Sequence, residues 1–193
     1  EAFAAWRQTG LGHDAAPVPQ RPQERQAWMR FKSQTLTRFT LDLRQAVQAI
    51  RGPQVKTARN LFALPILEPQ SEAWFAQNLD DFLAAYDWTV PMAMPLMESV
   101  PIDASQAWLT RLVQAVARHP GALKKTIFEL QARDWNRRQQ NAIPDQQLAD
   151  WMRLLRLNGV KNYGYYPDDF INNQPDISRI RPQFSSWWYP DHD

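Results

Sequence analysis

Polar and aromatic residues that could act on a carbohydrate stand at four separated places in the sequence. They are Asn60, then Glu98, then Asp134 with Trp135, and finally Tyr165, Tyr166 and Asp168. Glycoside hydrolases typically use two carboxyl groups, one of which protonates the leaving oxygen. Trp and Tyr rings offer flat apolar surfaces with a polar edge, which suit the faces of sugar rings. The pattern indicates carbohydrate chemistry if the fold brings the four places together.

Other kinds of site find little support in the sequence. There is no cysteine, which excludes disulfides and thiolate metal ligands. The three histidines, His13, His119 and His192, fall in a linker, at a predicted helix end and in the tail. We therefore predict neither a histidine metal site nor a Ser–His pair, and we predict that this chain holds no cofactor.

Some of these residues also have a purely structural interpretation. Acidic residues beside loops are often helix caps, which is the interpretation we prefer for Asp103 and Asp145. Asp168 and Asp169 could form a solvated turn. With nine Trp in the chain, burial in a core stays open for each of them.

The elements that would position the four places alternate between helix and strand. Apolar residues at helical spacing predict one helix over 26–50, a second beginning at Ser71, a third around 108–116 and a fourth around 148–155. Stretches rich in β-branched and aromatic residues predict strands over 54–60, 86–94, 125–131 and 160–166. Glu129 and Gln131, near the end of the third strand, could also point toward the strand ends.

A repeated helix–strand order predicts an α/β fold with parallel strands and right-handed crossovers. No glycine-rich phosphate motif occurs. Because a full (β/α)8 TIM-type barrel takes about 250 residues, we predict that 1–193 is the second half of such a barrel, with a linker-like lead-in over 1–22. Half a barrel exposes two sheet edges, so we expect this half to need the other.

Composition and charge narrow the class of protein further. Hydrophobic residues make up 44% of the chain, enough for a core, and charged residues 22%. A net charge of +2, without a basic helix face, argues against a nucleic-acid partner. No apolar run reaches the roughly 18 residues of a membrane span.

Several long strings are distinctive enough to suggest a family. They are Ala-Arg-Asn-Leu-Phe-Ala-Leu-Pro (58–65), Tyr-Asp-Trp-Thr-Val-Pro-Met-Ala-Met-Pro-Leu-Met-Glu (86–98), Phe-Glu-Leu-Gln-Ala-Arg-Asp-Trp (128–135), Asn-Gly-Val-Lys-Asn-Tyr-Gly-Tyr-Tyr-Pro-Asp (158–168) and Ser-Ser-Trp-Trp-Tyr-Pro (185–190). Over essentially its whole length the chain resembles the C-terminal glycoside-hydrolase-like domain of the PgaB family. These are periplasmic poly-β-1,6-N-acetyl-D-glucosamine N-deacetylases of biofilm export.

The resemblance implies a two-domain parent protein. An N-terminal polysaccharide deacetylase domain would hold a divalent metal, and a C-terminal (β/α)8 domain would bind the partly deacetylated polymer and in some members cleave it. This chain would be the later half of that second domain. The deacetylase and the segment with the family's principal catalytic Asp would lie outside it. The implied location is periplasmic, associated with the outer membrane through the N-terminus.

The resemblance also assigns roles to individual residues. It implies that the polymer groove is lined by Trp74, Trp135, Tyr165 and Tyr166. Their places at the predicted strand ends add Asn60, Asp134 and Asp168 as further substrate-binding residues. Glu98 is the implied acidic residue at the cleavage site. Glucosamine units carry ammonium groups, which an acidic rim of Glu98, Asp134 and Asp168 would attract.

Three functions stay open at this point. The leading prediction is polymer binding, with the other barrel half and the deacetylase domain as partners. The first alternative is direct endo-glycosidase cleavage with Glu98 in the mechanism. The second is a non-catalytic scaffold that docks the outer-membrane export porin.

Overall fold

The computed structural model describes residues 21–135 and 141–184. Most of the predicted lead-in and the Ser-Ser-Trp-Trp-Tyr-Pro string at 185–190 lie outside the described residues. The α-helices are α2 (Pro22–Arg51), α3 (Ala63–Leu67), α4 (Glu72–Phe75), α5 (Leu79–Ala85), α6 (Ile102–Ala117), α7 (Asp145–Leu157) and α8 (Ile177–Ile180). The strands are β1 (Ala58–Leu61), β2 (Trp88–Ala93), β3 (Phe128–Gln131), β4 (Arg133–Asp134), β5 (Asn141–Ala142) and β6 (Tyr163–Tyr166). Short 3₁₀ turns η1 (Pro69–Ser71), η2 (Ala122–Lys124) and η3 (Arg181–Gln183) complete the order.

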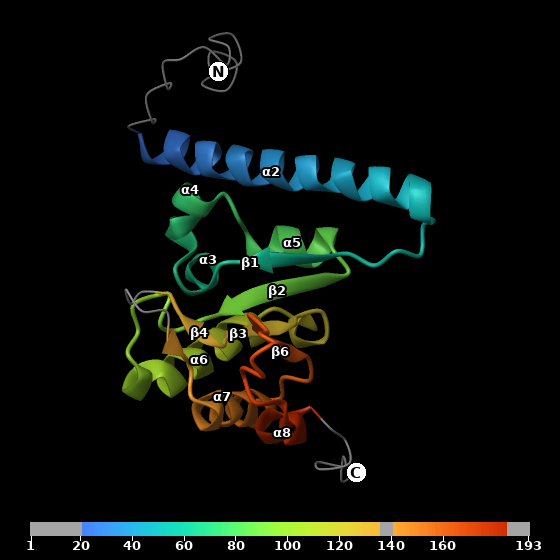
Figure 1. Ribbon diagram of the computed structural model, residues 1–193. Helices are drawn as coiled ribbons and strands as arrows, with labels where there is room; N and C mark the ends of the chain where they lie inside the picture. Colours follow the sequence, from blue (N-terminus) through green and yellow to red (C-terminus); the bar gives the residue numbers. More distant parts are fainter. Residues whose placement is uncertain (1–20, 136–140, 185–193) are drawn as a thin grey trace.

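The main sheet contains four parallel strands in the order β1-β2-β3-β6 (Figure 1). Helices separate these strands along the chain, as the predicted helix–strand alternation requires. Strands β4 and β5 form a separate antiparallel pair between β3 and α7. The four strands overlap the predicted ranges but begin later, because the residues before them make only isolated contacts, such as the single bridge between Thr126 and Thr89. The predicted half of a TIM-type barrel is confirmed.

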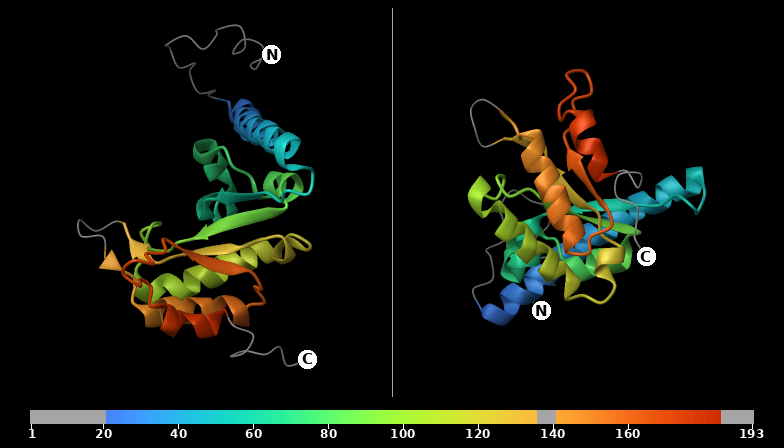
Figure 2. Two further views of the ribbon diagram at one scale, coloured as in Figure 1. Left: turned by 45° about the vertical axis from the view of Figure 1, so that its right-hand side comes forward. Right: turned by 90° about the horizontal axis from the view of Figure 1, so that it is seen from below.

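The two faces of the sheet differ in what covers them. Residues paired across parallel strands lie on the same face, so the register places Asn60, Met92, Glu129 and Tyr166 on one face. On the opposite face Leu61, Ala93, Phe128 and Leu130 are fully buried against the helices. Figure 2 shows α6 and α7 lying along this buried face. The first face is the one that a closed barrel would turn inward.

Helices α6 and α7 supply most of the core beneath the sheet. Leu109, Leu112, Leu148 and Met152 are completely buried there. One hydrogen bond joins the two helices, since the Trp151 indole N–H donates to the Ser105 hydroxyl oxygen at 2.8 Å. Helix α7 ends at Leu157 and is followed by Asn158 and Gly159; Gly159 has a φ of 82°, the left-handed value common just after a helix end.

Helix α2 contacts the rest of the chain mainly through polar groups. Arg30 pairs with Glu72 and Asp81, and Arg44 donates to the Ala85 carbonyl at 2.8 Å. The predicted apolar face of this helix is largely uncovered within the described residues: Phe39, Leu43, Val47 and Ile50 are exposed. The sequence correctly predicted the amphipathic helix, but these four side chains do not point into the core of this half.

Candidate functional site

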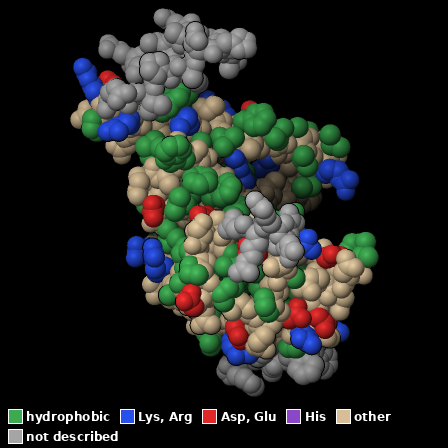
Figure 3. All heavy atoms as spheres, turned by 60° about the vertical axis from the view of Figure 1, so that its left-hand side comes forward, with side chains coloured by type: hydrophobic (Ala, Val, Ile, Leu, Met, Phe, Trp, Pro, Cys, Tyr) green, Lys and Arg blue, Asp and Glu red, His purple; other side chains and the backbone are tan. Residues whose placement is uncertain are grey.

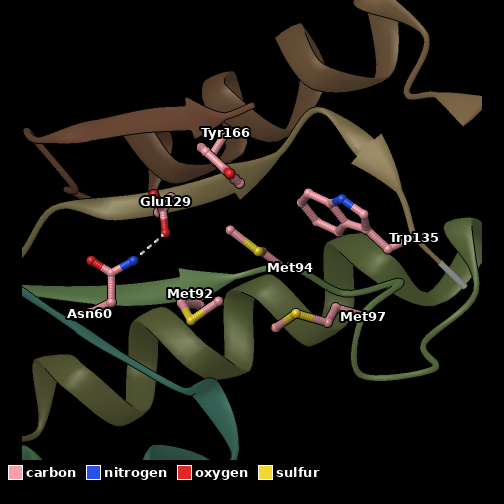
Figure 4. A pocket seen from close by; sticks show the side chains of 7 residues that line it. All are labelled: Asn60, Met92, Met94, Met97, Glu129, Trp135 and Tyr166. Carbon is pink, nitrogen blue, oxygen red and sulfur yellow. Dashed lines mark hydrogen bonds between the residues drawn. The ribbon is translucent and has the colours of Figure 1, made fainter. Parts of the chain in front are cut away.

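A pocket of about 290 Å³ opens at the carboxyl ends of the parallel strands. Its lining residues come from every strand of the main sheet and from the loops after them: Asn60, Met92, Met94, Met97, Glu129, Trp135 and Tyr166 (Figure 4). This volume lies near the lower end of the range for ligand pockets, roughly 300–1,000 Å³. In the space-filling view, apolar side chains gather over much of the face shown, and both acidic and basic ones are scattered among them (Figure 3).

A hydrogen-bonded pair of polar residues forms one side of the pocket. The Asn60 amide donates to Glu129 Oε2 at 2.8 Å, across the intervening strand β2 (Figure 4). Partial burial raises the pKa of the Glu129 carboxyl, although the Asn60 hydrogen bond acts in the opposite direction. Two polar side chains from different strands thus form a fixed unit.

An aromatic pair forms another side. The rings of Trp135 and Tyr166 stack with centroids 6.1 Å apart and an interplanar angle of 25°. Tyr166 is the last residue of β6 and is 56% exposed. Trp135 directly follows β4. The pair presents accessible aromatic surface beside a carboxylate, the combination that a sugar face and its polar substituents require.

Methionine side chains form the apolar part of the pocket. Met92 lies near Asn60, Met94 near the middle of the pocket and Met97 near Trp135 (Figure 4). Flexible thioethers of this kind give an adaptable apolar surface. The sequence analysis did not assign these methionines to the site. A signal for Met92 was present, because Trp88, Val90 and Met92 follow a period of two and lie on one face of the predicted strand.

Buried Gln131 fixes the loop that carries Met97. Its side-chain oxygen accepts hydrogen bonds from the backbone N–H of Leu96 at 2.7 Å and of Met97 at 3.3 Å. Its amide donates to the Arg133 carbonyl at 2.9 Å. Gln131 therefore links the loop after β2 to the chain between β3 and Trp135.

Three of the predicted site residues, Asn60, Trp135 and Tyr166, line this pocket. Glu98 does not; it lies in the loop after β2 and is half-buried. Burial raises the pKa of the Glu98 carboxyl, and the nearby charge of Glu68 raises it further. A catalytic role for Glu98 stays a prediction.

Tyr165 and Asp168 interact with each other rather than with the pocket residues. Tyr165 lies on the opposite face of β6 from Tyr166, because neighbouring residues of a strand alternate, and it contacts Phe184. Its hydroxyl donates to Asp168 at 3.0 Å, and burial together with Asp168 raises the pKa of Tyr165 to about 12. Their predicted contact with polymer is not tested by this arrangement.

Asp134 and Trp74 lie elsewhere again. Asp134 is buried and lines a neighbouring hollow together with Leu96, Ile143 and Pro144. Trp74 is 87% exposed on α4, away from the pocket lining. A bound polymer would contact Asp134 or Trp74 only if it extended beyond the pocket. The roles of both residues therefore remain predictions.

The described residues hold no group of three or more His, Asp or Glu side chains that could bind a metal ion. Within the same residues, no helix combines the length and the apolar character that crossing a membrane requires. The prediction of a cofactor-free chain is not tested by these observations.

The fold and the site together define the class of protein. Parallel strands alternating with helices, with a pocket at the strands' carboxyl ends, are the arrangement of a (β/α)-barrel enzyme domain. The model of GHL13, described as hypothetical glycosyl hydrolase family 13, matches residues 1–166. The chain belongs to this family.

Individual relatives agree with this assignment. The chain is 53% identical over 193 residues to the poly-beta-1,6-N-acetyl-D-glucosamine N-deacetylases of Escherichia coli K12 and O157:H7, covering all of this chain and 29% of each relative. Its structure superposes on the PgaB (BpsB) glycoside hydrolase domain from Bordetella bronchiseptica with a TM-score of 0.84 at 43% identity. That match covers 95% of this chain and 51% of the solved chain. The predicted resemblance to the PgaB family is confirmed.

Proposed function

We propose that the pocket binds partially deacetylated poly-β-1,6-N-acetyl-D-glucosamine, within a protein that combines N-deacetylase and glycoside hydrolase domains. The observation that carries this proposal is the stacked Trp135–Tyr166 pair beside the Asn60–Glu129 pair at the strand ends. The names of the relatives support the choice of polymer.

Binding measurements on variants of the full-length protein test this function. Calorimetric titration with a partially deacetylated oligomer should show weaker binding by Trp135→Ala and by Tyr166→Ala. Each loss should correspond to about 1–3 kcal/mol, comparable with the loss of a buried aromatic contact. The cause is the loss of ring surface for a sugar face.

Phe170→Ala is the matched control. Phe170 is also a large exposed aromatic residue, 82% exposed, but it does not line the pocket. Its removal should leave the affinity unchanged. Equal affinities for wild type, Trp135→Ala and Tyr166→Ala, with all three folded, would disprove binding at this pocket.

A second candidate function is cleavage of the polymer with Glu98 in the mechanism. The raised pKa of the Glu98 carboxyl favours it, because a general acid must hold its proton near the working pH. Glu98→Gln should then abolish product formation, followed by mass spectrometry, while largely preserving binding. Unchanged turnover would remove Glu98 from the mechanism.

A wider proposal concerns the location of the protein and its neighbouring domains. The protein would act in the periplasm, associated with the outer membrane, beside its deacetylase domain and the other half of the barrel. Docking of the export porin is a further proposal, for which the described residues supply no specific feature.

A further inference from the structure

Exposed apolar side chains gather beside the two edges of the main sheet. Within residues 21–135 and 141–184, most of the large apolar side chains that are exposed belong to α2 or to the stretch 166–184. Helix α2 precedes the edge strand β1, and 166–184 begins at the end of the edge strand β6. Single exposed apolar side chains are ordinary on a protein surface, whereas neighbouring ones often mark contact sites. The group after β6 therefore marks a second contact surface, distinct from the α2 face.

The most exposed members of this group lie in the loop between β6 and α8, residues 167–176, which we call the β6 loop. At its tip Phe170 and Ile171 are 82% and 81% exposed. In the right-hand view of Figure 2 the loop, drawn in red, projects from the rest of the molecule. Two large apolar side chains that are neighbours in sequence are thus left in solvent.

Polar contacts fix the shape of the β6 loop. Asp169 and Gln174 exchange two backbone hydrogen bonds, at 2.8 and 3.0 Å, which close the loop below its tip. The Asp169 carboxylate accepts from the Asn172 N–H at 3.1 Å and from the Asn172 side-chain amide at 2.9 Å. It also pairs with Arg133 of β4 at 3.8 Å. The apolar tip is therefore held outward by an ordered loop, and a partner would meet a surface that is already organised.

The position of β6 indicates what this partner is. Among the described residues, β6 pairs with β3 on one side and forms an edge of the sheet on the other. In a closed barrel of eight parallel strands the last strand pairs with the first, so the loops after these two strands lie next to each other. The solved glycoside hydrolase domain extends well beyond the part that this chain matches, which covers 51% of it. The other barrel half would therefore place a loop directly beside Phe170 and Ile171.

A second copy of the protein is the competing partner, and the area of the tip argues against it. An aromatic side chain buries roughly 150–250 Å², so two side chains fall well short of the roughly 800 Å² per partner of a standard complex. A contact within one chain needs no such area, because it does not cost the translational and rotational freedom of a second molecule.

We propose that Phe170 and Ile171 pack against the first strand–loop–helix unit of the other barrel half, so that the β6 loop fastens the barrel at its closing seam. Neither side chain lines the pocket. The contact therefore stabilises the closed barrel without contributing to the affinity for a ligand in the pocket, and the proposal does not depend on which ligand binds there.

Thiol labelling of the full-length protein tests whether the tip is covered. Ile171→Cys and the control Gln146→Cys each add one thiol to a stretch of 193 residues that has no cysteine. Gln146 is exposed on α7, on the far side of the molecule's core from the sheet edges. With N-ethylmaleimide, the Ile171→Cys thiol should react about tenfold or more slowly than the control, because a covered thiol reacts only when its contact opens. In denaturant the two rates should be equal, and mass spectrometry locates the label.

A stability measurement on the full-length protein tests the same contact by another route. The double substitution Phe170→Ser/Ile171→Ser should lower the melting temperature of the barrel domain by roughly 3 °C or more, since it removes buried apolar surface. Leu157→Ser is the matched control, because Leu157 is 74% exposed at the end of α7 and lies away from both edge strands. The control should melt like wild type.

Three results would overturn the proposal. The first is a native labelling rate for Ile171→Cys equal to that of Gln146→Cys. The second is a folded Phe170→Ser/Ile171→Ser protein that melts at the wild-type temperature. The third is protection of the Ile171→Cys thiol that disappears on dilution while light scattering shows a fall in molecular mass, which would identify a second copy as the partner.

Discussion

Gln131 shows how one buried polar residue shapes the candidate site. It is completely buried, and its three hydrogen bonds connect the loop carrying Met97 with the chain leading to Trp135. Both are pocket residues. The geometry of the pocket therefore depends on a side chain that does not line it.

Replacing Gln131 by leucine should damage both stability and binding. The N–H groups of Leu96 and Met97 would lose their acceptor while partly buried, which costs about 1–3 kcal/mol. Thermal unfolding of the full-length protein and oligomer titration measure the two effects. Gln146→Leu is the control, because the exposed Gln146 side chain donates to Asp150 within α7 and holds no loop of the pocket. A Gln131→Leu protein as stable as the control would contradict this role.

For individual residues, the sequence predicted the place of some members of the pocket but not of others. Asn60, Trp135 and Tyr166 follow from the rule that barrel sites lie at strand ends. The prediction treated Tyr165 and Tyr166 alike, although alternation along a strand separates their faces. The position of Glu98 depends on the loop after β2, whose path no periodicity determines.

Among the elements, the starts of β1 and β2 are joined through Asp87. Its carboxylate accepts from the Thr57 N–H at 2.9 Å and the Thr57 hydroxyl at 3.1 Å, and it pairs with Lys56 and Arg44 of α2. The Thr57 N–H and Lys56 are the leading causes that lower the pKa of Asp87 to about 2. One side chain thus holds a helix and two strands together.

Stability should depend on pH through this group. Because the folded pKa of Asp87 lies below its unfolded value of 3.8, its contribution is present above about pH 4 and is lost as the pH falls toward 2. Because solvent screens this group and its exposed partner Lys56, the size is about 1 kcal/mol. Asp87→Asn should therefore destabilise the protein at pH 6, with a smaller difference from wild type near pH 2.5, in denaturant unfolding. A difference that does not vary with pH would contradict this account, and Asp42→Asn is the surface control.

Element types were predictable because helix periodicity and β-rich segments are local signals. The short pair β4–β5 was not predicted, since two-residue strands leave no pattern in the sequence. The environment of α2 was also beyond local reasoning. Its periodicity identifies an apolar face but not which neighbour covers that face.

At the scale of the whole molecule, the unpaired sheet edges and the exposed apolar face of α2 share one explanation. The described sheet has β1 and β6 as its edges, and α2 exposes Phe39, Leu43, Val47 and Ile50. The solved glycoside hydrolase domain is about twice as long as the part this chain matches. We expect the remaining barrel elements to cover the α2 face and pair with the sheet edges.

The central claim is that polymer binds where the parallel strands end, between the Trp135–Tyr166 pair and the Asn60–Glu129 pair. A crystal structure of the full-length protein with a β-1,6-linked glucosamine oligomer tests it most directly. The account predicts a sugar ring within about 4 Å of Trp135 or Tyr166. An oligomer bound only at Trp74, or in the hollow lined by Asp134 and Ile143, would contradict it.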